Sequence, residues 1–337
     1  MKKITFLQEH LLHYRKEFYN SLAETFEVEV VCKTSDHSYK NEKFLVKKNK
    51  VLEIFGFKIF KDLKINSHYI VYPLDFYFLD SIISLFKTDK NIFYWGIGNG
   101  NNKFTNKIRH FLFKNKNLFL YSDKAKSFIS NDSNKKQIVI NNTIRVDIPI
   151  VQKSMRNSLL FIGSLTKRKK LKEAILAFDK CLKNFGQNIK MEIIGDGDER
   201  ESLEQLVLDL GIDENITFHG AVIDAKEKEH VFSRCFATGL YGQCGLSAIE
   251  SIGNGVPVIT TVNAITGGEI LSVVDDLTGK IVNENTSDFS SAIHEIYNKN
   301  FNSSMVEDCI NFYKKNYSLD NMVHKFRKGF NEESTFH

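Results

Sequence analysis

Three glycine-rich segments in the second half of the sequence have residue types that suit phosphate binding. In the first, residues 161–170 (FIGSLTKRKK), a strand pattern ends at Gly163 and four consecutive cations precede a helix pattern. Helix N-termini favour anions, and positive side chains beside them strengthen that preference. The segment predicts a phosphate or diphosphate site, although a solvated basic turn would fit the pattern equally well.

The second segment, residues 193–204 (IIGDGDERESLE), joins a strand pattern to a helix pattern. Gly195 and Gly197 permit a tight turn and close approach of the backbone to a ligand. The acidic residues that follow suit the positive end of a helix dipole, and an ordinary turn would explain them as well. Only the paired glycines therefore favour ligand binding.

The third segment, residues 240–260 (LYGQCGLSAIESIGNGVPVIT), places a glycine-rich loop before a helix that we expect to begin near Leu246. The amides of Gly245, Leu246 and Ser247 would point out of the helix start toward a phosphate. Glu250 lies one turn further on, where its carboxylate could accept two hydroxyls, such as those of a ribose. A glutamate on a solvent-facing helix is an equally good interpretation of that position.

The elements that would position these loops are short apolar strand patterns alternating with amphipathic helix patterns. Strand patterns occupy residues 3–7, 27–32, 68–73, 91–95, 117–122 and 137–140, and then 158–163, 191–195, 215–220, 236–241, 257–261 and 279–282. This alternation predicts parallel sheets built from βαβ units, in which ligands lie beyond the carboxyl ends of the strands. We therefore predict an α/β protein with two doubly wound, Rossmann-like domains.

The domain limits are set by residues 149–157, which are polar and lack periodicity. We predict an N-terminal domain at 1–150, a second domain at 157–312, and a C-terminal helix within 313–337 that packs back toward the first domain.

The first 150 residues hold 25 Lys and Arg against 15 Asp and Glu, whereas 15 of the 19 glycines come later. The basic half suggests an anionic surface, membrane or nucleic acid as partner, and the glycine-rich half suggests a ligand.

Composition excludes several classes of protein. With 337 residues, 42% of them hydrophobic and 26% charged, the chain can form two ordinary cores and is neither disordered nor collagen-like. Five cysteines without a CxxC pair fit buried thiols in a reducing cytoplasm and predict no zinc site. Charged residues interrupt the apolar N-terminus too early for a signal peptide, and Pro73, Asp75 and Asp80 break the most apolar window.

In order and spacing, the three segments resemble the nucleotide-binding half of the family 4 retaining glycosyltransferases, which have the GT-B fold of two Rossmann-like domains facing across a cleft. The resemblance covers about residues 159–282 and rests on Gly163 with Lys169 six residues later, a GDG turn, Phe-x-Gly, Gly-Leu-x-x-x-Glu, Gly-x-Pro-Val-Ile and a Thr-Gly pair. The first half is similar, more loosely, to a polysaccharide and O-antigen assembly branch, through residues 13–24 (HYRKEFYNSLAE), 94–98 (YWGIG) and 142–144 (NTI).

The resemblance implies roles for individual residues. Lys169 and Arg168 would neutralise the departing diphosphate, so neither a metal ion nor another cofactor is expected. The full sets are Ser164, Arg168, Lys169, Gly245, Leu246 and Ser247 for the donor diphosphate; Gly195, Gly197, Val222 and Glu250 for the nucleoside; Gly242, Gln243 and Cys244 for the donor sugar; and Tyr14, Arg15, Trp95 and Gly96 on the acceptor side.

Two positions depart from the family pattern on the donor side. Ser164 stands where the family usually has arginine, and Gly242 stands where the first of two paired glutamates normally contacts the donor sugar. The second departure bears on the identity of the sugar more than on activity. Gln243 or the main-chain amide of Gly242 could take over part of the missing role.

A further departure concerns the catalytic acid or base. Ile97 stands where the polysaccharide branch has a histidine, so we name no catalytic group. His10, His13 and His110 are weak candidates, because a single histidine is more often packed or at the surface than catalytic.

The function implied is that of a retaining hexosyl- or N-acetylhexosaminyl-transferase. It would move a sugar from a nucleotide sugar, expected to be a UDP-sugar, to a lipid-linked glycan during synthesis of capsule, exopolysaccharide or O-antigen (lipopolysaccharide). We expect a cytoplasmic protein, with peripheral binding to the cytoplasmic face of the inner membrane as a further hypothesis. Residues 104–119 would suit an interfacial helix, although a core helix with solvated lysines is the slightly stronger interpretation.

Three other functions stay open with less support. A non-catalytic GT-B partner subunit would explain Gly242 and Ser164. A sugar-nucleotide epimerase would need cleft carboxylates and a histidine that the sequence does not offer. Nucleic acid is not expected as a partner, because no RNP, KH or zinc pattern accompanies the basic half.

Overall fold

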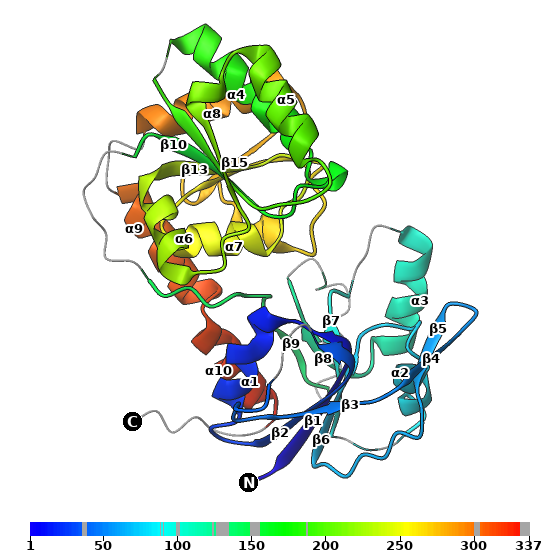
Figure 1. Ribbon diagram of the computed structural model, residues 1–337. Coiled ribbons are helices and arrows are strands. Elements are labelled where there is room, and N and C mark those ends of the chain that lie inside the picture. The colour runs from blue at the N-terminus through cyan, green and yellow to red at the C-terminus, as the bar shows by residue number, and fades with distance from the viewer. Residues whose placement is uncertain are drawn as a thin grey trace. The chain divides into compact units, whose positions relative to one another are not determined.

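The computed structural model describes residues 1–35, 39–87, 89, 91–98, 102–122, 125, 135–148, 156–186, 188–299 and 304–330. Contacts within the chain divide it into two compact units, which Figure 1 shows as separate sheets with their helices. The first unit comprises Met1–Arg145 and Ser318–His337, and the second comprises Val146–Tyr317. Most of the linker expected at 149–157 and the last seven residues of the chain lie outside the described residues.

The first unit is built on a seven-stranded sheet in the order β3-β2-β1-β6-β7-β8-β9, and all its neighbouring pairs are parallel. An antiparallel hairpin, β4-β5, comes between β3 and β6 in the chain. The strands are β1 (Lys3–Leu11), β2 (Glu27–Ser35), β3 (Leu45–Lys48), β4 (Val51–Ile54), β5 (Phe57–Phe60), β6 (Tyr69–Pro73), β7 (Ile92–Gly96), β8 (Asn117–Leu120) and β9 (Gln137–Val139).

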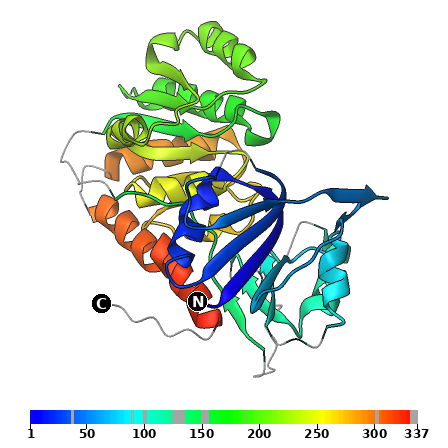
Figure 2. The same ribbon diagram turned by 60° about the horizontal axis from the view of Figure 1, so that its bottom comes forward.

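Helices cover both faces of this sheet because its strands are apolar on both sides. On one face, α1 (Lys16–Leu22) and α10 (Leu319–Gly329) bury Phe18 and Phe326 against Phe6 and Trp95. On the other face, α2 (Leu79–Ser84) and α3 (Lys103–Phe113) contribute to a second core around Tyr94 and Leu118. Figure 2 shows α1 and α10 side by side, in agreement with their direct contact.

Helix α10 belongs to the first unit although it comes last in the chain. The Phe326 ring lies 4.1 Å from that of Phe119 and 5.1 Å from that of Trp95, centroid to centroid. At the end of the helix, Tyr69 donates to the carbonyl of Phe330 at 2.6 Å and Lys136 to that of Gly329 at 2.9 Å. Aromatic packing and these bonds together fix the helix on the sheet.

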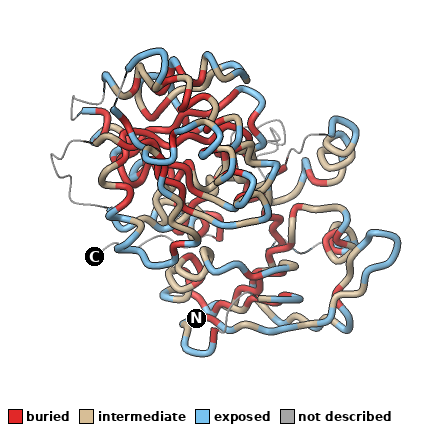
Figure 3. The backbone as a smooth tube through the Cα atoms, turned by 45° about the horizontal axis from the view of Figure 1, so that its top comes forward, coloured by how far each residue is buried: buried red, intermediate tan, exposed pale blue. Residues whose placement is uncertain are grey.

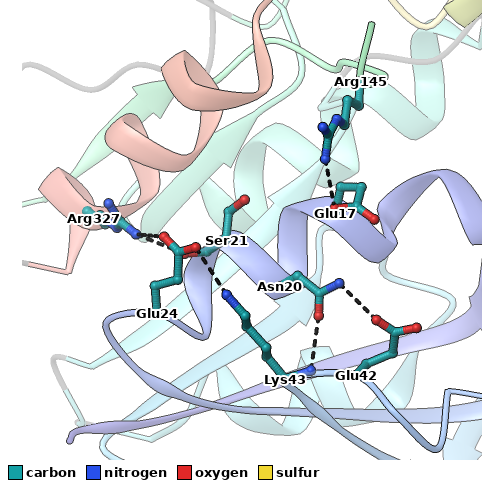
Figure 4. A network of polar contacts seen from close by, with 8 residues as sticks. All are labelled: Glu17, Asn20, Ser21, Glu24, Glu42, Lys43, Arg145 and Arg327. Carbon is teal, nitrogen blue, oxygen red and sulfur yellow. Dashed lines mark hydrogen bonds and ion pairs between the residues drawn. The ribbon is translucent and has the colours of Figure 1, made fainter. Parts of the chain in front are cut away.

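The outer face of α1 is held by a network of polar contacts (Figure 4). Asn20 donates to Glu42 at 2.9 Å and accepts from the amide of Lys43 at 3.1 Å. Glu24 pairs with both Lys43, at 3.3 Å, and Arg327 of α10, at 3.7 Å. The helix is therefore anchored through the loop before β3 as well as through its apolar face.

The second unit has a six-stranded parallel sheet in the order β12-β11-β10-β13-β14-β15. Figure 3 shows buried residues, in red, gathered inside this part of the chain, with exposed residues, in pale blue, around them. Its elements are β10 (Ser158–Ile162), α4 (Leu171–Phe185), β11 (Lys190–Ile194), α5 (Arg200–Leu210), β12 (Ile216–Gly220), α6 (Ala225–Arg234), β13 (Cys235–Leu240), α7 (Leu246–Gly253), β14 (Val258–Thr261), β15 (Gly279–Val282), α8 (Thr286–Lys299) and α9 (Ser304–Asn316).

Alternate residues of β10 explain why this sheet is covered on both faces. Leu159 and Phe161 pack into a core with α4, α5 and α8, whereas Leu160 and Ile162 pack into a second core with α6. The predicted α/β class with two Rossmann-like sheets is therefore confirmed. Among the described residues, no helix is long and apolar enough to cross a membrane.

The interpretation of residues 104–119 as one core helix is wrong. The helix α3 ends at Phe113, and residues 117–120 form the buried strand β8. On α3 itself only Phe113 is buried, while Phe104 and Phe111 are 70% and 75% exposed. Periodicity identified the helix correctly but assigned too much of its aromatic face to the core.

We predict that Phe326→Ala lowers the free energy of unfolding by about 3–5 kcal/mol, because it leaves a cavity among four aromatic rings. Phe111→Ala makes the same chemical change at an exposed position and should cost less than about 0.5 kcal/mol. Urea denaturation of both variants measures the difference. Equal losses would show that α10 does not depend on this packing.

Candidate functional site

The strand order of the second unit places two of the three predicted loops together. The chain runs outward from β10 to β12 on one side and from β13 to β15 on the other, so the order reverses between β10 and β13. Ligands of open parallel sheets bind beyond the carboxyl ends of the strands at such a point. Residues 163–170 follow β10 and residues 241–245 follow β13, and these loops form the candidate site.

The loop after β11 packs against the loop after β10 with no space between the two backbones. A Cβ on Gly195 would lie 1.8 Å from the carbonyl oxygen of Gly163, and one on Gly197 would lie 2.4 Å from that of Leu165. Hydrogen bonds join the same segments, with Leu165 donating to the carbonyl of Asp196 at 2.9 Å. The paired glycines are thus explained by contact with the first loop, which removes the reason for taking them as a sign of ligand approach.

Gly242 makes a similar contact from the opposite side. A Cβ there would lie 2.5 Å from the carbonyl oxygen of Arg168, and the Gly242 amide donates to the carbonyl of Lys169 at 3.0 Å. The space that a glutamate would need at this position is therefore filled by backbone. The amide is also engaged, so it does not take over the role of the missing glutamate as we had suggested.

Lys169 is the cation that these contacts position. It lies in the 3₁₀ helix η3 (Lys167–Lys169), and its Nζ is 3.3 Å from the place that a Cβ of Gly163 would occupy. Burial, together with the neighbouring charge of Arg168, lowers the pKa of the Lys169 ammonium below its ordinary value. Its neighbour Lys170 pairs with Glu284, whereas within the described chain no carboxylate pairs with Lys169.

The start of α7 offers hydrogen-bonding groups beside this cation. Gly245 is the N-cap residue, it is extended, and it provides no side-chain cap for the first amides of the helix. Ser247 Oγ and Gln243 Oε1 are buried without a partner among the described residues. Uncapped amides and an uncompensated ammonium together fit an oxyanion such as a phosphate.

The three residues expected at the donor sugar differ in what they can offer. The Gly242 amide is engaged, and the amide of Cys244, whose side chain is buried, donates to the carbonyl of Ile265 at 3.0 Å. Gln243 retains a side-chain oxygen without a partner in the described part of the chain. Gln243 is therefore the strongest of the three candidates for contact with a sugar.

The residues expected at the nucleoside also differ. Glu250 accepts from Lys228 Nζ at 3.1 Å through Oε1, which leaves the second carboxylate oxygen for a ligand. The side chain of Val222 packs with Ile162 and Phe232 in the core, so contact with a base would have to come from its main chain.

Ser164, which was expected at the diphosphate, lies exposed at the start of the first loop.

The acceptor-side candidates lie in the first unit, at the carboxyl ends of β1 and β7. The Arg15 guanidinium lies 4.1 Å from the centroid of the Trp95 ring and donates to the hydroxyl of Tyr121. Tyr14 lies beside it, with its ring centroid 5.5 Å from the guanidinium carbon. A Cβ on Gly96 would lie 2.9 Å from Leu74 Cβ, so this glycine is required by packing.

Sequence reasoning named Tyr14, Arg15, Trp95 and Gly96, but it identified neither Tyr121 nor the stacking of these groups. The three histidines are dispersed: His10 contacts Thr34 at 2.6 Å beside β2, His13 adjoins Tyr14, and His110 is on α3. In the described part of the chain, no three His, Cys, Asp or Glu side chains are arranged to hold a metal ion.

Comparison with known proteins identifies the family. Residues 144–316, just over half of the chain, match the family model described as glycosyl transferases group 1. The chain belongs to this family. Over 105 residues, or 31% of its length, this glycosyl transferase family member is 32% identical to the uncharacterized glycosyltransferase MJ1607 of Methanocaldococcus jannaschii, and the match spans 26% of that protein.

Solved structures agree with this assignment at the level of the fold. The apo form of the lipopolysaccharide outer core galactosyltransferase WaaB aligns with a TM-score of 0.69 at 14% identity, covering 97% of this chain and 99% of WaaB. The Anabaena protein HepE in complex with UDP aligns with a TM-score of 0.70 at 13% identity, covering 98% of this chain and 99% of HepE. The expected GT-B fold is confirmed.

We predict that Gly242→Ala displaces residues 168–169 of this family member and lowers its free energy of unfolding by about 1–3 kcal/mol. Gly245→Ala, three residues away, has its nearest neighbour atom at 3.9 Å and serves as the matched control. Thermal unfolding of the two variants compares the costs. A loss as small as that of the control would contradict the close contact.

Proposed function

We propose that this chain is a retaining glycosyltransferase that moves a hexosyl or N-acetylhexosaminyl group from a UDP-sugar to a lipid-linked glycan. Membership of the group 1 family and the GT-B fold support transfer from a nucleotide sugar. The names of WaaB, which acts in lipopolysaccharide synthesis, and of HepE, solved with UDP, support the choice of pathway and nucleotide. The observation that carries the proposal is the Lys169 ammonium, without a carboxylate partner in the described chain, beside the uncapped start of α7.

Each part of the site has a task in this reaction. The bond between the sugar and the diphosphate breaks, the electron pair leaves with the phosphate oxygen, and the acceptor hydroxyl oxygen forms the new bond. Lys169 and the amides of Gly245 to Ser247 stabilise the charge that develops on the leaving phosphate. The departing phosphate takes the proton of the acceptor hydroxyl on the same face, which accounts for retention without a protein base. The remaining oxygen of Glu250 accepts hydroxyls of the ribose.

One of the two observations that suggested a non-catalytic subunit has another explanation. That alternative was suggested by Gly242 and Ser164, and the contact of Gly242 with Arg168 and Lys169 supplies a packing reason for the first. Within the described chain Glu284 pairs with Lys170 and no carboxylate pairs with Lys169, which suits an anionic donor, because such a carboxylate would compete with the phosphate for Lys169.

We predict that Lys169→Gln weakens UDP binding about 10- to 100-fold, the loss expected for one charge-assisted contact of about 1.4–2.7 kcal/mol. Lys170→Gln is the matched control, because Lys170 already pairs with Glu284 and should change affinity less than about 2-fold. Titration calorimetry with UDP, GDP and dTDP, with and without EDTA, measures both variants. Since burial lowers the pKa of Lys169, affinity should fall as the pH rises, starting at a lower pH than for an ordinary lysine.

Three results would contradict the proposed site or its chemistry. If no nucleotide binds the unmodified chain, the proposed donor class is wrong. If Lys170→Gln weakens binding as much as Lys169→Gln does, the basic run acts only through its total charge. Binding that requires a divalent ion would reject the proposed neutralisation by lysine alone.

We also propose that α3 brings the first unit to an anionic membrane surface, where a lipid-linked acceptor would be found. Phe104 and Phe111 are largely exposed on α3, and at the tip of the β4-β5 hairpin Phe55 is fully exposed. Residues 102–122 contain five Lys and Arg and no Asp or Glu. Exposed aromatic rings among cations are typical of interfacial helices, and each cation near an anionic leaflet contributes about 1 kcal/mol.

We predict that vesicles containing an anionic lipid bind the full chain and that the double change Phe104→Ser with Phe111→Ser weakens binding at least about 10-fold. Leu208→Ser removes an exposed apolar side chain from α5 of the second unit and serves as the control. Sedimentation with neutral and anionic vesicles at two salt concentrations measures the effect. Equal binding of the double variant and the control would contradict a role for α3.

A further inference from the structure

Among the described residues, Arg15 differs from the cations around it in having no carboxylate partner. Lys16 pairs with Glu42 at 2.9 Å, Arg145 pairs with Glu17 at 3.2 Å, and Arg327 pairs with Glu24 at 3.7 Å (Figure 4 draws the last two). Arg15 is surrounded instead by the rings of Tyr14, Trp95 and Tyr121, at 4.1 to 5.5 Å from the guanidinium carbon. Among the described residues, this half-buried positive charge has aromatic faces and tyrosine hydroxyls around it and no carboxylate.

Unmet hydrogen-bond donors lie in the same cluster. Trp95 is only 8% exposed, and its indole nitrogen has no acceptor in the described chain. The same is true of Gln8 Nε2, while Gln8 Oε1 accepts from the hydroxyl of Tyr19 at 3.2 Å. Gln8 lies two residues beyond Phe6 on the same face of β1, and the Phe6 ring is 5.8 Å from that of Trp95.

These groups share one chemical character. An indole N–H and a guanidinium are donors only, and the free atom of Gln8 is likewise a donor. Tyr19 supplies no negative charge at neutral pH, because burial raises its pKa further above neutrality. A ligand that satisfied the cluster would therefore have to be an acceptor, and the charge of Arg15 favours an anion.

The cluster also stands where a parallel sheet binds ligands. In the first unit the strand order reverses between β1 and β6. Arg15 ends the 3₁₀ helix η1 (His13–Arg15) that follows β1, and Trp95 is the penultimate residue of β7, the neighbour of β6. The site thus lies over the carboxyl ends of the strands beside this reversal point.

We infer that Arg15, Trp95 and Gln8 form an oxyanion site that binds a negatively charged group of the acceptor. This inference rests on the proposed function and narrows its acceptor to anionic glycans. Two sources share the chemistry: the phosphate of a lipid diphosphate, and the carboxylate of an acidic sugar. The stack on Trp95 and the bond to Tyr121 leave the positive charge of Arg15 without an anionic partner among the described residues.

The chain carries its own reporter for this site, because Trp95 is its single tryptophan. The full-length protein is titrated at constant ionic strength with inorganic phosphate, pyrophosphate or glucuronate, with sodium chloride as the reference, while tryptophan emission is recorded. We expect a saturable change with at least one of the three anions. Preference for the phosphates would indicate a lipid diphosphate, and preference for glucuronate an acidic sugar.

Matched variants locate the response. Arg15→Gln should weaken the apparent affinity at least about 10-fold, whereas Lys16→Gln, whose lysine is paired with Glu42, should stay within about 2-fold. Lys169→Gln should retain the response, which separates this site from the donor loop. If Arg15→Gln does not fold, Arg15→Lys decides: it keeps the charge but loses the planar stack on Trp95, and we expect about 5-fold weaker binding.

The outcomes separate this inference from the proposed function. A response no different from that to sodium chloride, or an unchanged response in the Arg15 variants, would overturn the oxyanion site even if UDP binds normally in calorimetry. If UDP fails to bind while the response of Trp95 persists, the acceptor role falls with the proposed function. Normal UDP binding by Arg15→Gln together with a lost tryptophan response supports the inference.

Discussion

The loop of residues 163–169 packs so closely against two other loops that Gly195, Gly197 and Gly242 on those loops have no room for a Cβ atom. Gly195 and Gly197 contact the backbone of Gly163 and Leu165 from one side, and Gly242 contacts Arg168 and Lys169 from the other. The first loop is consequently held by backbone packing and backbone hydrogen bonds, which depend little on the identity of its side chains. That rigidity directs the Lys169 ammonium over Gly163, beside the start of α7.

The same contact links two features that looked independent. The family's first glutamate is absent at residue 242, and the main chain of Arg168 and Lys169 occupies the space that its side chain would need. Its absence also removes a carboxylate that would otherwise lie close to Lys169. The ammonium therefore keeps its charge available for a ligand. In the proposed reaction one contact to the donor sugar is lost, and Gln243, whose Oε1 has no partner among the described residues, is the residue of this loop that can replace part of it.

The sequence was most informative where periodicity and burial agree. All twelve strand patterns are strands, because parallel strands covered on both faces need continuous apolar runs. The strands β3, β4 and β5 were missed because they are short and, apart from Phe60, contain no buried residue, so packing leaves little trace in their composition. The motif order located the loops of the candidate site, but it could not distinguish glycines that contact a ligand from glycines that contact another loop.

Interactions between distant segments could not be predicted. Arg15 and Trp95 were each named from a motif, yet nothing in the sequence shows that the guanidinium stacks on the indole or that it lacks a carboxylate. The aromatic face of α3 presents a related limit. A helical stripe of Phe and Ile has the same period whether it faces a core or solvent, so only the packed structure distinguishes Phe113 from Phe111.

The positive excess of the first 150 residues takes two physical forms. Exposed cations without acidic neighbours, as on α3, interact through water and are screened over about 10 Å at 0.1 M salt. Arg15 is enclosed by aromatic rings, where the effective dielectric constant is lower and salt screens less. The attraction of exposed cations to a membrane surface, as proposed for α3, must therefore weaken as the salt concentration rises. Binding of an anion by Arg15, as proposed, depends mainly on how well the anion matches the hydrogen-bond donors of the site. A net charge alone conceals this difference, because one form acts over a surface and the other at a single site.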